Sequence, residues 1–314
     1  MRDPVLLLLQ GYSKLYYFVK HRLHAGNIRG FGFLSRLARR DAILTVEDGA
    51  RIVFDHQAAA NYACLLGGHY NEPETHLFVR RVLDGVAKPC SFVDVGANIG
   101  EMLVDFARHP RVEKALAFEP SARCAGIIVR SCGLNGLRNV SVVTKAVGER
   151  VGCGVMPRDA RSQCSTSVRM EEQSPTYDDK LFENVEVTTL DVEIPDPSGL
   201  WIMLIDVEGG ELAVMRGGQV FLQIVRPLII FEYHEVTRTH FSLDDVRAEL
   251  GNDYELFRLR SDGFLDRDLR QTHNCVAVPR ISPFHDLIRT LITDDLPKPF
   301  THRSVSDALV GGNR

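Results

Sequence analysis

The sequence predicts an α/β protein with a Rossmann-like, mostly parallel seven-stranded sheet that carries helices on both faces. From Cys90 onward, short apolar runs alternate with helical stretches, which is the pattern of consecutive βαβ units. Residues 92–100, Phe-Val-Asp-Val-Gly-Ala-Asn-Ile-Gly, indicate a buried strand, a glycine turn and the start of a helix. Glu119 then ends the next apolar run, and this order indicates a nucleoside-binding half-domain.

Each element of this sheet is predicted from a local pattern. Apolar runs of strand length alternate with stretches in which apolar residues have helical spacing. Gly133, Gly136 and Gly251 stand where helices are expected to end. The predicted strands are 91–95, 115–118, 140–144, 201–205, 228–231, 254–259 and 274–278, and the predicted helices are 102–109, 122–134, 212–225 and 243–250.

Residues 1–86 are predicted to form a separate N-terminal segment that is mainly helical. Residues 1–40 have apolar positions at helical spacing, and residues 42–55 carry two β-rich runs around a central Asp-Gly, which predicts a hairpin. A helix is expected to end near Leu65, and another is expected over residues 72–86.

The sheet domain is predicted to cover residues 87–282. Within it, residues 149–190 are polar, show no clear helix and end in an alternating run. We therefore expect a β-arm or an active-site flap there. Residues 283–314 are expected to form a peripheral tail, with one helix followed by disorder.

Composition is that of an ordinary globular protein, with 45% hydrophobic and 25% charged residues in a chain of 314. The seven cysteines include no CxxC pair and no zinc-like spacing, which indicates reduced thiols in a reducing compartment. The sequence has no apolar run of the roughly 20 residues that span a bilayer, and no signal-peptide pattern. We therefore expect a cytoplasmic protein.

Charge is distributed unevenly along the chain. Residues 1–40 carry eight Lys or Arg and one acid, which leaves 29 basic and 40 acidic residues in the rest. This basic stretch, interleaved with Leu, Tyr and Phe, could contact an acidic membrane surface or simply pack on the acidic body of its own chain. An acidic body disfavours nucleic acid as a partner.

The glycine turn has the features of a ligand-binding loop. Gly96 allows a tight turn, and Gly100 lets the helix begin close to the strand, so that a ligand can approach main-chain amides at the helix N-terminus. Asp94 at the strand end can accept hydrogen bonds from a cationic or hydroxylated ligand. A tight turn without a ligand is the alternative.

Glu119, 25 residues after Asp94, would face the ribose of a nucleoside cofactor. This arrangement leaves NAD and S-adenosylmethionine both open. Asn98 stands where the dinucleotide fingerprint has glycine, and Asp94 suits a cationic cofactor. The Tyr-x-x-x-Lys pair of short-chain dehydrogenases occurs only as Tyr16 and Lys20, ahead of the first core strand. These features favour S-adenosylmethionine.

Seven motifs together resemble the FkbM-type methyltransferase family. They follow one another in order and at family-like spacing over about residues 90–235, and Asp-Val-Glu-Gly-x-Glu is the most specific of them. The first 75 residues carry no motif of this family. The matching stretches are 94–100 (DVGANIG), 118–120 (FEP), 134–140 (LNGLRNV), 146–148 (AVG), 189–191 (TLD), 205–211 (IDVEGGE), and 226–227 (RP) with 230–232 (IFE).

The resemblance implies a class I methyltransferase fold, S-adenosylmethionine as methyl donor, and O-methylation of sugars or natural products. Gly210 stands where the family commonly has Phe or Ala. By position, the cofactor-binding residues would be Asp94, Gly96, Asn98, Gly100, Glu119 and Asp206, with Asn135 and Ala146 near the adenine edge.

Four residues are the candidates for catalysis: Asp206, Glu208, Glu232 and His234. They follow two predicted strands at the carboxyl edge, where ligands of open α/β sheets bind. Methylation of an alcohol requires a carboxylate or imidazole near the hydroxyl proton. As alternatives, the same four residues could ligate a divalent cation, or Glu208 and Glu211 could only cap the following helix.

The predicted function is methyl transfer to a hydroxyl of a saccharide or natural product, so the expected partner is a small-molecule or glycan acceptor. No metal is assigned. An NAD(P)-dependent oxidoreductase on the same fold is one alternative, and a catalytically silent scaffold is another. The intact acidic set argues against the scaffold.

Overall fold

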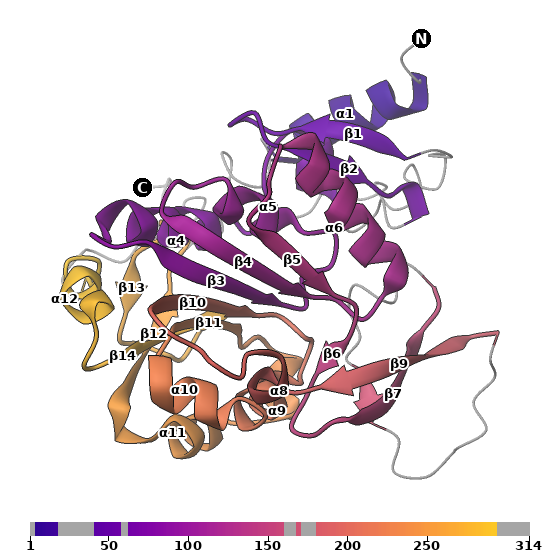
Figure 1. The fold of residues 1–314 in the computed structure, drawn as a ribbon. Coiled ribbons are helices and arrows are strands. Elements are labelled where there is room, and N and C mark those ends of the chain that lie inside the picture. The colour runs from indigo at the N-terminus through magenta and orange to yellow at the C-terminus, as the bar shows by residue number, and fades with distance from the viewer. Residues whose placement is uncertain (1–3, 18–40, 58–61, 160–167, 171–179, 294–314) are drawn as a thin grey trace, which may run out of the picture.

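A computed structural model describes residues 4–17, 41–57, 62–159, 168–170 and 180–293 (Figure 1). Its centre is an eight-stranded sheet with the strand order β13-β12-β14-β11-β10-β3-β4-β5. All seven predicted strands are present, and a two-residue strand that we did not predict extends the edge. The strands are β3 (Cys90–Val95), β4 (Val112–Phe118), β5 (Val140–Val143), β10 (Leu200–Ile205), β11 (Leu228–Glu232), β12 (Tyr254–Leu259), β13 (Leu265–Asp266) and β14 (Asn274–Pro279).

Parallel pairing brings the ends of distant strands to one edge of the sheet. Strands β5, β4, β3, β10 and β11 are all parallel neighbours, whereas β14 pairs antiparallel with β11 and with β12. In this register Asp94 of β3 pairs with Leu204 of β10 and Ala117 of β4. The acids that follow these strands therefore gather at the carboxyl edge, where such folds bind ligands.

The helices around the sheet begin at recognisable caps. Helix α6 (Ala122–Leu134) begins at Ser121, whose hydroxyl accepts from the Cys124 amide, and α11 (Leu243–Leu250) begins with a capping box at Ser242. Both have the predicted bounds. Helix α5 (Glu101–Ala107) begins one residue early and ends two residues early.

The single helix predicted over 212–225 is wrong. The chain forms α9 (Glu211–Arg216) and α10 (Gln219–Val225), which are separated by Gly217 and Gly218. A Cβ on Gly217 would lie 2.0 Å from the main-chain oxygen of Gly148. The helix is therefore interrupted because another segment packs directly against its backbone, which apolar periodicity does not reveal.

Helices cover both faces of the sheet, as predicted (Figure 1). One apolar cluster joins the sheet to α4 (Pro73–Gly85), α5, α6 and α12 (Pro283–Arg289), and a second joins the other face to α9, α10 and α11. The short α8 (Leu190–Glu193) and the 3₁₀ turns Thr237–Thr239 and Gly251–Asp253 complete the second side. The expected helix in the C-terminal tail is α12, and the disorder expected after it lies outside the described residues.

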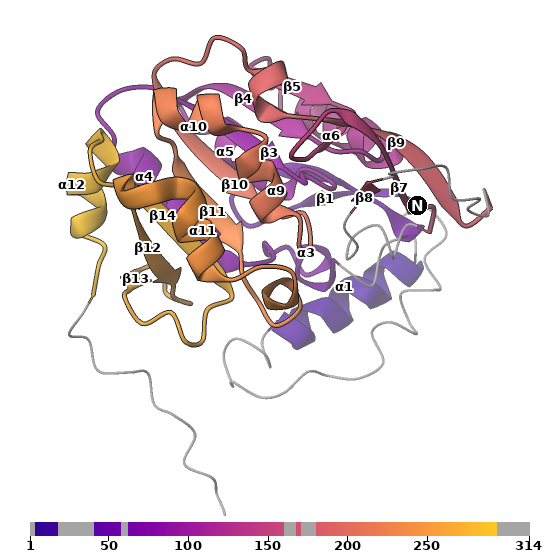
Figure 2. The ribbon, with the colours of Figure 1, turned by 90° about the horizontal axis from the view of Figure 1, so that it is seen from below.

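The N-terminal segment contains the predicted hairpin, β1 (Ala42–Thr45) and β2 (Arg51–Phe54). Of the helix predicted over residues 1–40, the described part is α1 (Pro4–Tyr17), which lies beside the short α3 (Ala63–Leu66) (Figure 2). Side chains of α1, the hairpin and the sheet share one apolar cluster. Among the described helices, none has the length and apolar character needed to cross a bilayer.

A β-arm stands beside the carboxyl edge of the central sheet (Figure 1). Its strands are β6 (Ala146–Val147), β7 (Gly152–Pro157), β8 (Arg169–Met170) and β9 (Phe182–Thr188), in the order β6-β9-β7-β8. This is the β-structure expected for residues 149–190. Residues 160–167 and 171–179 lie outside the described part.

Candidate active site

Two cavities meet at the carboxyl edge of the sheet. The larger cavity has a volume of about 380 Å³, within the range of roughly 300–1,000 Å³ typical of small-molecule sites. Six of the predicted site residues line it: Gly96, Asn98, Glu119, Ala146, Asp206 and Glu208.

The glycine turn brings the chain into direct contact with the end of β10. Gly96 has φ +88°, and a Cβ there would lie only 1.8 Å from the main-chain oxygen of Asp206. Asn98 is also left-handed, with φ +51°. A side chain on Gly100 would press on Ile128 of α6, so Gly100 allows α5 and α6 to approach. These contacts restrict the loop to a single conformation.

Glu119 is held by the loop that it faces. Its Oε2 accepts from the Asn98 amide and its Oε1 from the Ser121 amide, both at 2.8 Å. Burial, together with the charge of Asp94, raises the pKa of Glu119 to about 7 against the lowering effect of these two amides. Each carboxylate oxygen keeps a lone pair, so Glu119 can accept from two ribose hydroxyls.

The β-arm supplies an apolar wall to the larger cavity. Met156, Val168 and Val187 line it together with Ala146. A flat aromatic base can pack against such a wall. Asn135 does not join this site: it ends α6, and its side chain bonds the main chain of Arg51 on β2.

The acidic cavity, of about 210 Å³, adjoins the larger one and shares four residues with it. The shared residues are Gly96, Asn98, Asp206 and Glu208. Amide and phenol groups complete the polar lining, and the carboxylate residues are Glu72, Asp94, Glu101, Asp206, Glu208 and Glu232.

Asp206 and Glu232 are hydrogen-bonded neighbours at the ends of β10 and β11. Burial, followed by the charges of Glu232, Glu72 and Glu208, raises the pKa of Asp206 well above its ordinary value. Burial and the neighbouring carboxylates also raise the pKa of Glu232, to about 8, although a hydrogen bond with Asp206 opposes this shift. The pair therefore shares a proton more readily than it holds two negative charges.

Glu208 and Glu211 have different roles in the loop after β10. Glu208 has φ +59°, a left-handed conformation that is costly for a residue with a side chain, and it faces both cavities. Glu211 is fully buried, and its Oε1 accepts from the amides of Val207 and Gly209. The alternative of a purely structural, helix-capping role therefore suits Glu211, while Glu208 is available to a ligand.

His234 lies next to Glu232 but does not line either cavity. Its Nδ1 accepts from the Thr237 amide at 3.2 Å, so the ring proton of the neutral imidazole is on Nε2. Nε2 lies 3.4 Å from Oε1 of Glu232. His234 therefore presents a donor to Glu232 rather than a lone pair to a ligand, which does not suit the general-base or metal-ligand role expected of it.

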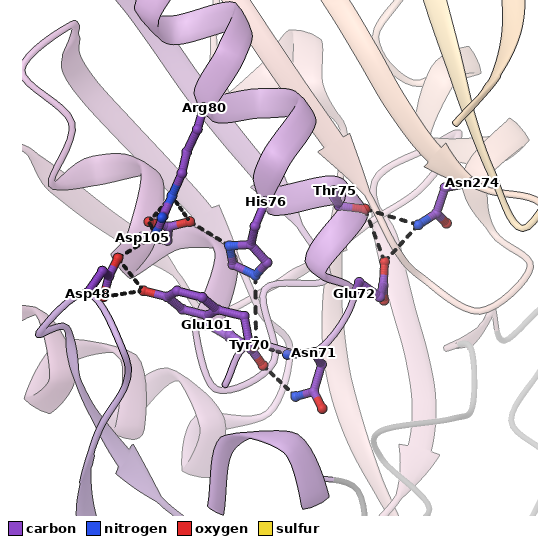
Figure 3. A network of polar contacts seen from close by, with 10 residues as sticks. All are labelled: Asp48, Tyr70, Asn71, Glu72, Thr75, His76, Arg80, Glu101, Asp105 and Asn274. Carbon is purple, nitrogen blue, oxygen red and sulfur yellow. Dashed lines mark hydrogen bonds and ion pairs between the residues drawn. The ribbon is translucent and has the colours of Figure 1, made fainter. Parts of the chain in front are cut away.

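Four residues of the acidic cavity come from segments where we predicted no site: Tyr62, Asn71, Glu72 and Asn274. Glu72 precedes α4 with φ +45°, and its Oε2 accepts from the Asn274 side chain at 2.7 Å (Figure 3). Asn71 donates from its amide and its side chain to Glu101. In the sequence, Asn-Glu-Pro signals only the start of a helix.

A buried charge network holds α4 against α5 behind this cavity (Figure 3). Nδ1 of His76 lies 2.5 Å from Asp105, and Nε2 lies 3.7 Å from Glu101. Burial alone would lower the pKa of His76, but the two carboxylates raise it to about 9. Arg80 also binds Asp105, so His76 and Arg80 together balance this carboxylate and Glu101.

The family model of the methyltransferase FkbM domain matches residues 94–264, which is more than half of the chain. The chain belongs to the FkbM methyltransferase family. The matched stretch runs from Asp94 of β3 past Glu119, Asp206 and Glu232, so it contains the whole lining of the larger cavity and part of the lining of the acidic one. No match was found among curated proteins.

Solved structures of methyltransferases are also similar. A methyltransferase FkbM from Methylobacillus flagellatus shares 16% identity (TM-score 0.43) over 71% of this chain, which spans about half, 52%, of that protein. A putative Streptococcus mutans methyltransferase with bound SAH shares 9% (TM-score 0.37; 67% of this chain, 98% of that one). M. jannaschii TYW2 with AdoMet shares 12% (TM-score 0.37; 81% and 88%).

FkbM family membership decides between the two cofactors that the sequence left open, in favour of S-adenosylmethionine. The larger cavity fits this group: the cradle at Gly96 admits no side chain, and Glu119 is placed for a ribose. Asp94 lines the adjoining acidic cavity, where burial raises its pKa to about 7. Its carboxylate suits the cationic methionine end of the cofactor.

Proposed function

We propose that this FkbM family member transfers the methyl group to a hydroxyl oxygen of a saccharide or natural product, with Asp206 as general base. The observation that carries the proposal is the junction of the two cavities at Gly96, Asn98, Asp206 and Glu208. A cofactor in the larger cavity and an acceptor in the acidic one would meet beside a carboxylate.

The residues around the junction account for the needs of the reaction. S-adenosylmethionine carries its methyl group on a positively charged sulfur, and this sulfur is the leaving group of the reaction. The glycine turn and Glu119 hold the donor, so that the acceptor oxygen can approach in line. As the oxygen–carbon bond forms and the carbon–sulfur bond breaks, Asp206 takes the hydroxyl proton.

The lining of the acidic cavity favours an acceptor rich in hydroxyl groups. Carboxylates and carboxamides offer many acceptor atoms to O–H donors, and Asn71 and Asn274 hold two of the carboxylates in place. A nucleic acid would bring phosphates next to these carboxylates, which disfavours it as the substrate.

Asp206→Asn tests the proposed base. With labelled S-adenosylmethionine and a panel of saccharides and hydroxylated natural products, we expect methyl ethers from the unmodified enzyme. The variant should lose about 10²–10⁴-fold in rate and still bind S-adenosylhomocysteine. Glu113→Gln, at an exposed position near the start of β4, is the matched control. Methylation of nitrogen or carbon, or full activity of Asp206→Asn, would contradict the proposal.

We also propose that α1 contacts an acidic membrane surface. Leu7, Leu8 and Leu15 are about half exposed on this helix, and the first 40 residues carry eight basic side chains. Sedimentation with phosphatidylglycerol vesicles should carry the protein down, and neutral phosphatidylcholine vesicles should not. Leu8→Ser should weaken the binding, while Val129→Ser on α6 should not. Equal sedimentation with both lipids would refute the contact.

A further inference from the structure

The acidic cavity has a large excess of negative groups. Six carboxylate residues line it, and the described lining contains no Lys, Arg or His. Outside the lining, His76 partly offsets Glu101 and Asp94. The ring of His234, also outside the lining, lies 3.4 Å from Oε1 of Glu232. Gathering like charges in a small buried volume is costly unless protons or a cation neutralise them.

The cofactor cannot supply all of this neutralisation. S-adenosylmethionine carries two positive charges and one negative, so it contributes a single net positive charge near Asp94 and Asp206. Glu72, Glu208 and Glu232 remain on the acceptor side. A further cation there would balance the negative charges of these carboxylates, which would bind it from more than one side.

Buried carboxylate oxygens without partners point to a ligand at this place. Asp94 is 2% exposed and lines the acidic cavity, and its Oδ2 makes no hydrogen bond. Oε2 of Glu232, which lines the same cavity, also makes no hydrogen bond. A cofactor ammonium paired with Asp94 would leave Oε2 of Glu232 without a partner, whereas buried polar groups are normally paired.

The geometry between β10 and β11 fits one metal ion. Oxygens that share a Mg²⁺ or Ca²⁺ ion lie within about 5 Å of each other, because each is about 2.0–2.6 Å from it. Glu208 and Glu232 offer ligand atoms within 4.8 Å. His234 is equally close, but its Nε2 carries the proton and cannot ligate. The remaining oxygen donors favour a hard divalent cation.

A second cluster of possible metal ligands serves as a comparison, because neighbouring side chains balance its negative charge. Asp41, Asp55 and His56 also offer three ligand atoms within 4.8 Å of one another. There, Arg123 pairs with Asp55 and Arg130 with Asp41. The cluster is already neutralised by side chains, unlike the pair at the ends of β10 and β11.

We propose that Glu208 and Glu232 bind a divalent cation in the acidic cavity, and that this ion coordinates neighbouring oxygens of the acceptor. The role toward the acceptor rests on the proposed function, whereas the ion site itself does not. Asp206, adjacent to both ligands, remains the group that takes the proton.

The test is calorimetric titration of the full chain, saturated with S-adenosylhomocysteine, with MnCl₂ and then with MgCl₂ and CaCl₂. We expect one site, with at least tenfold weaker Mn²⁺ binding in Glu232→Gln and in Glu208→Gln. Glu113→Gln should bind as the unmodified protein does. Binding of S-adenosylhomocysteine by each variant verifies that it is folded.

Absence of saturable binding of all three ions, with S-adenosylhomocysteine bound, would overturn the ion site. So would binding unchanged in both glutamine variants. Neither result affects the proposed methyl transfer, which is measured separately with Asp206→Asn. Retention of full methyl transfer after chelation by EDTA would remove the role of the ion toward the acceptor.

Discussion

The larger cavity and the acidic cavity are built in different ways. The larger cavity depends on main-chain geometry: Gly96 permits contact with Asp206, and two loop amides hold Glu119. The acidic cavity depends on side chains from segments far apart in the sequence, among them Glu72 before α4 and Asn274 on β14. The first is shaped mainly by main chain at the ends of paired strands, and the second by side chains from scattered segments.

Under the proposed function, this difference separates donor from acceptor recognition. A backbone cradle accepts one cofactor and tolerates little change, whereas a cavity assembled from side chains can be altered residue by residue. Methyl donors are the same across a family while acceptors vary, and the two constructions match that division of function. The predictions below test it from the largest expected effect to the smallest.

Gly96→Ala should have the largest effect. The new Cβ would lie 1.8 Å from a main-chain oxygen, at a φ that side chains rarely adopt, so β3 and β10 would have to separate. We expect affinity for S-adenosylhomocysteine to fall by more than about a thousandfold, measured by calorimetry. Gly126→Ala on α6, where a Cβ meets nothing within 4 Å, is the control and should bind normally. Near-normal binding by Gly96→Ala would mean that the backbone cradle is not needed.

His76→Gln should destabilise the wall of the acidic cavity. The change removes the protonated partner of Asp105 and Glu101, and breaking a buried ion pair costs about 3–5 kcal/mol. Because the pKa of His76 is raised from 6.5 to about 9, its stabilisation is complete below pH 6.5 and is lost as pH rises through 9. Urea unfolding at pH 6 and pH 10 should show this loss in the unmodified protein only.

If His76→Gln loses as much stability between pH 6 and pH 10 as the unmodified protein does, other groups are responsible for the pH dependence. Lys88→Gln, which replaces an exposed cation, serves as the control for a simple change of net charge. It should unfold at nearly the same urea concentration as the unmodified protein at both pH values.

The sequence predicted the larger cavity much better than the acidic one. Strand ends, a glycine turn and Glu119 are local patterns, and parallel pairing brings them together by rule. Asn71, Glu72 and Asn274 carry no such pattern, because their proximity depends on how α4 packs across the sheet. The tautomer of His234 likewise depends on the turn that follows it.

Affinity for the cofactor should depend on pH through Glu119. A ribose donates to the ionised carboxylate, and the pKa of Glu119 is raised to about 7 in the free protein. Binding of S-adenosylhomocysteine should therefore be constant above pH 7.5 and weaken by up to about tenfold per pH unit below 7. Glu119→Gln should bind more weakly and lose this dependence. If the binding of S-adenosylhomocysteine by Glu119→Gln still depends on pH, another group is responsible for that dependence.

Asn135→Ala should have the smallest effect, and only on stability. The family resemblance implied a place near the adenine edge, but the side chain of Asn135 bonds the main chain of Arg51 and the carbonyl of Ser131. It thus joins the end of α6 to β2. We expect a loss of about 1 kcal/mol in the free energy of unfolding, as for a few hydrogen bonds that water can replace. Affinity for S-adenosylhomocysteine should stay within about twofold, whereas a tenfold loss would return Asn135 to the cofactor site.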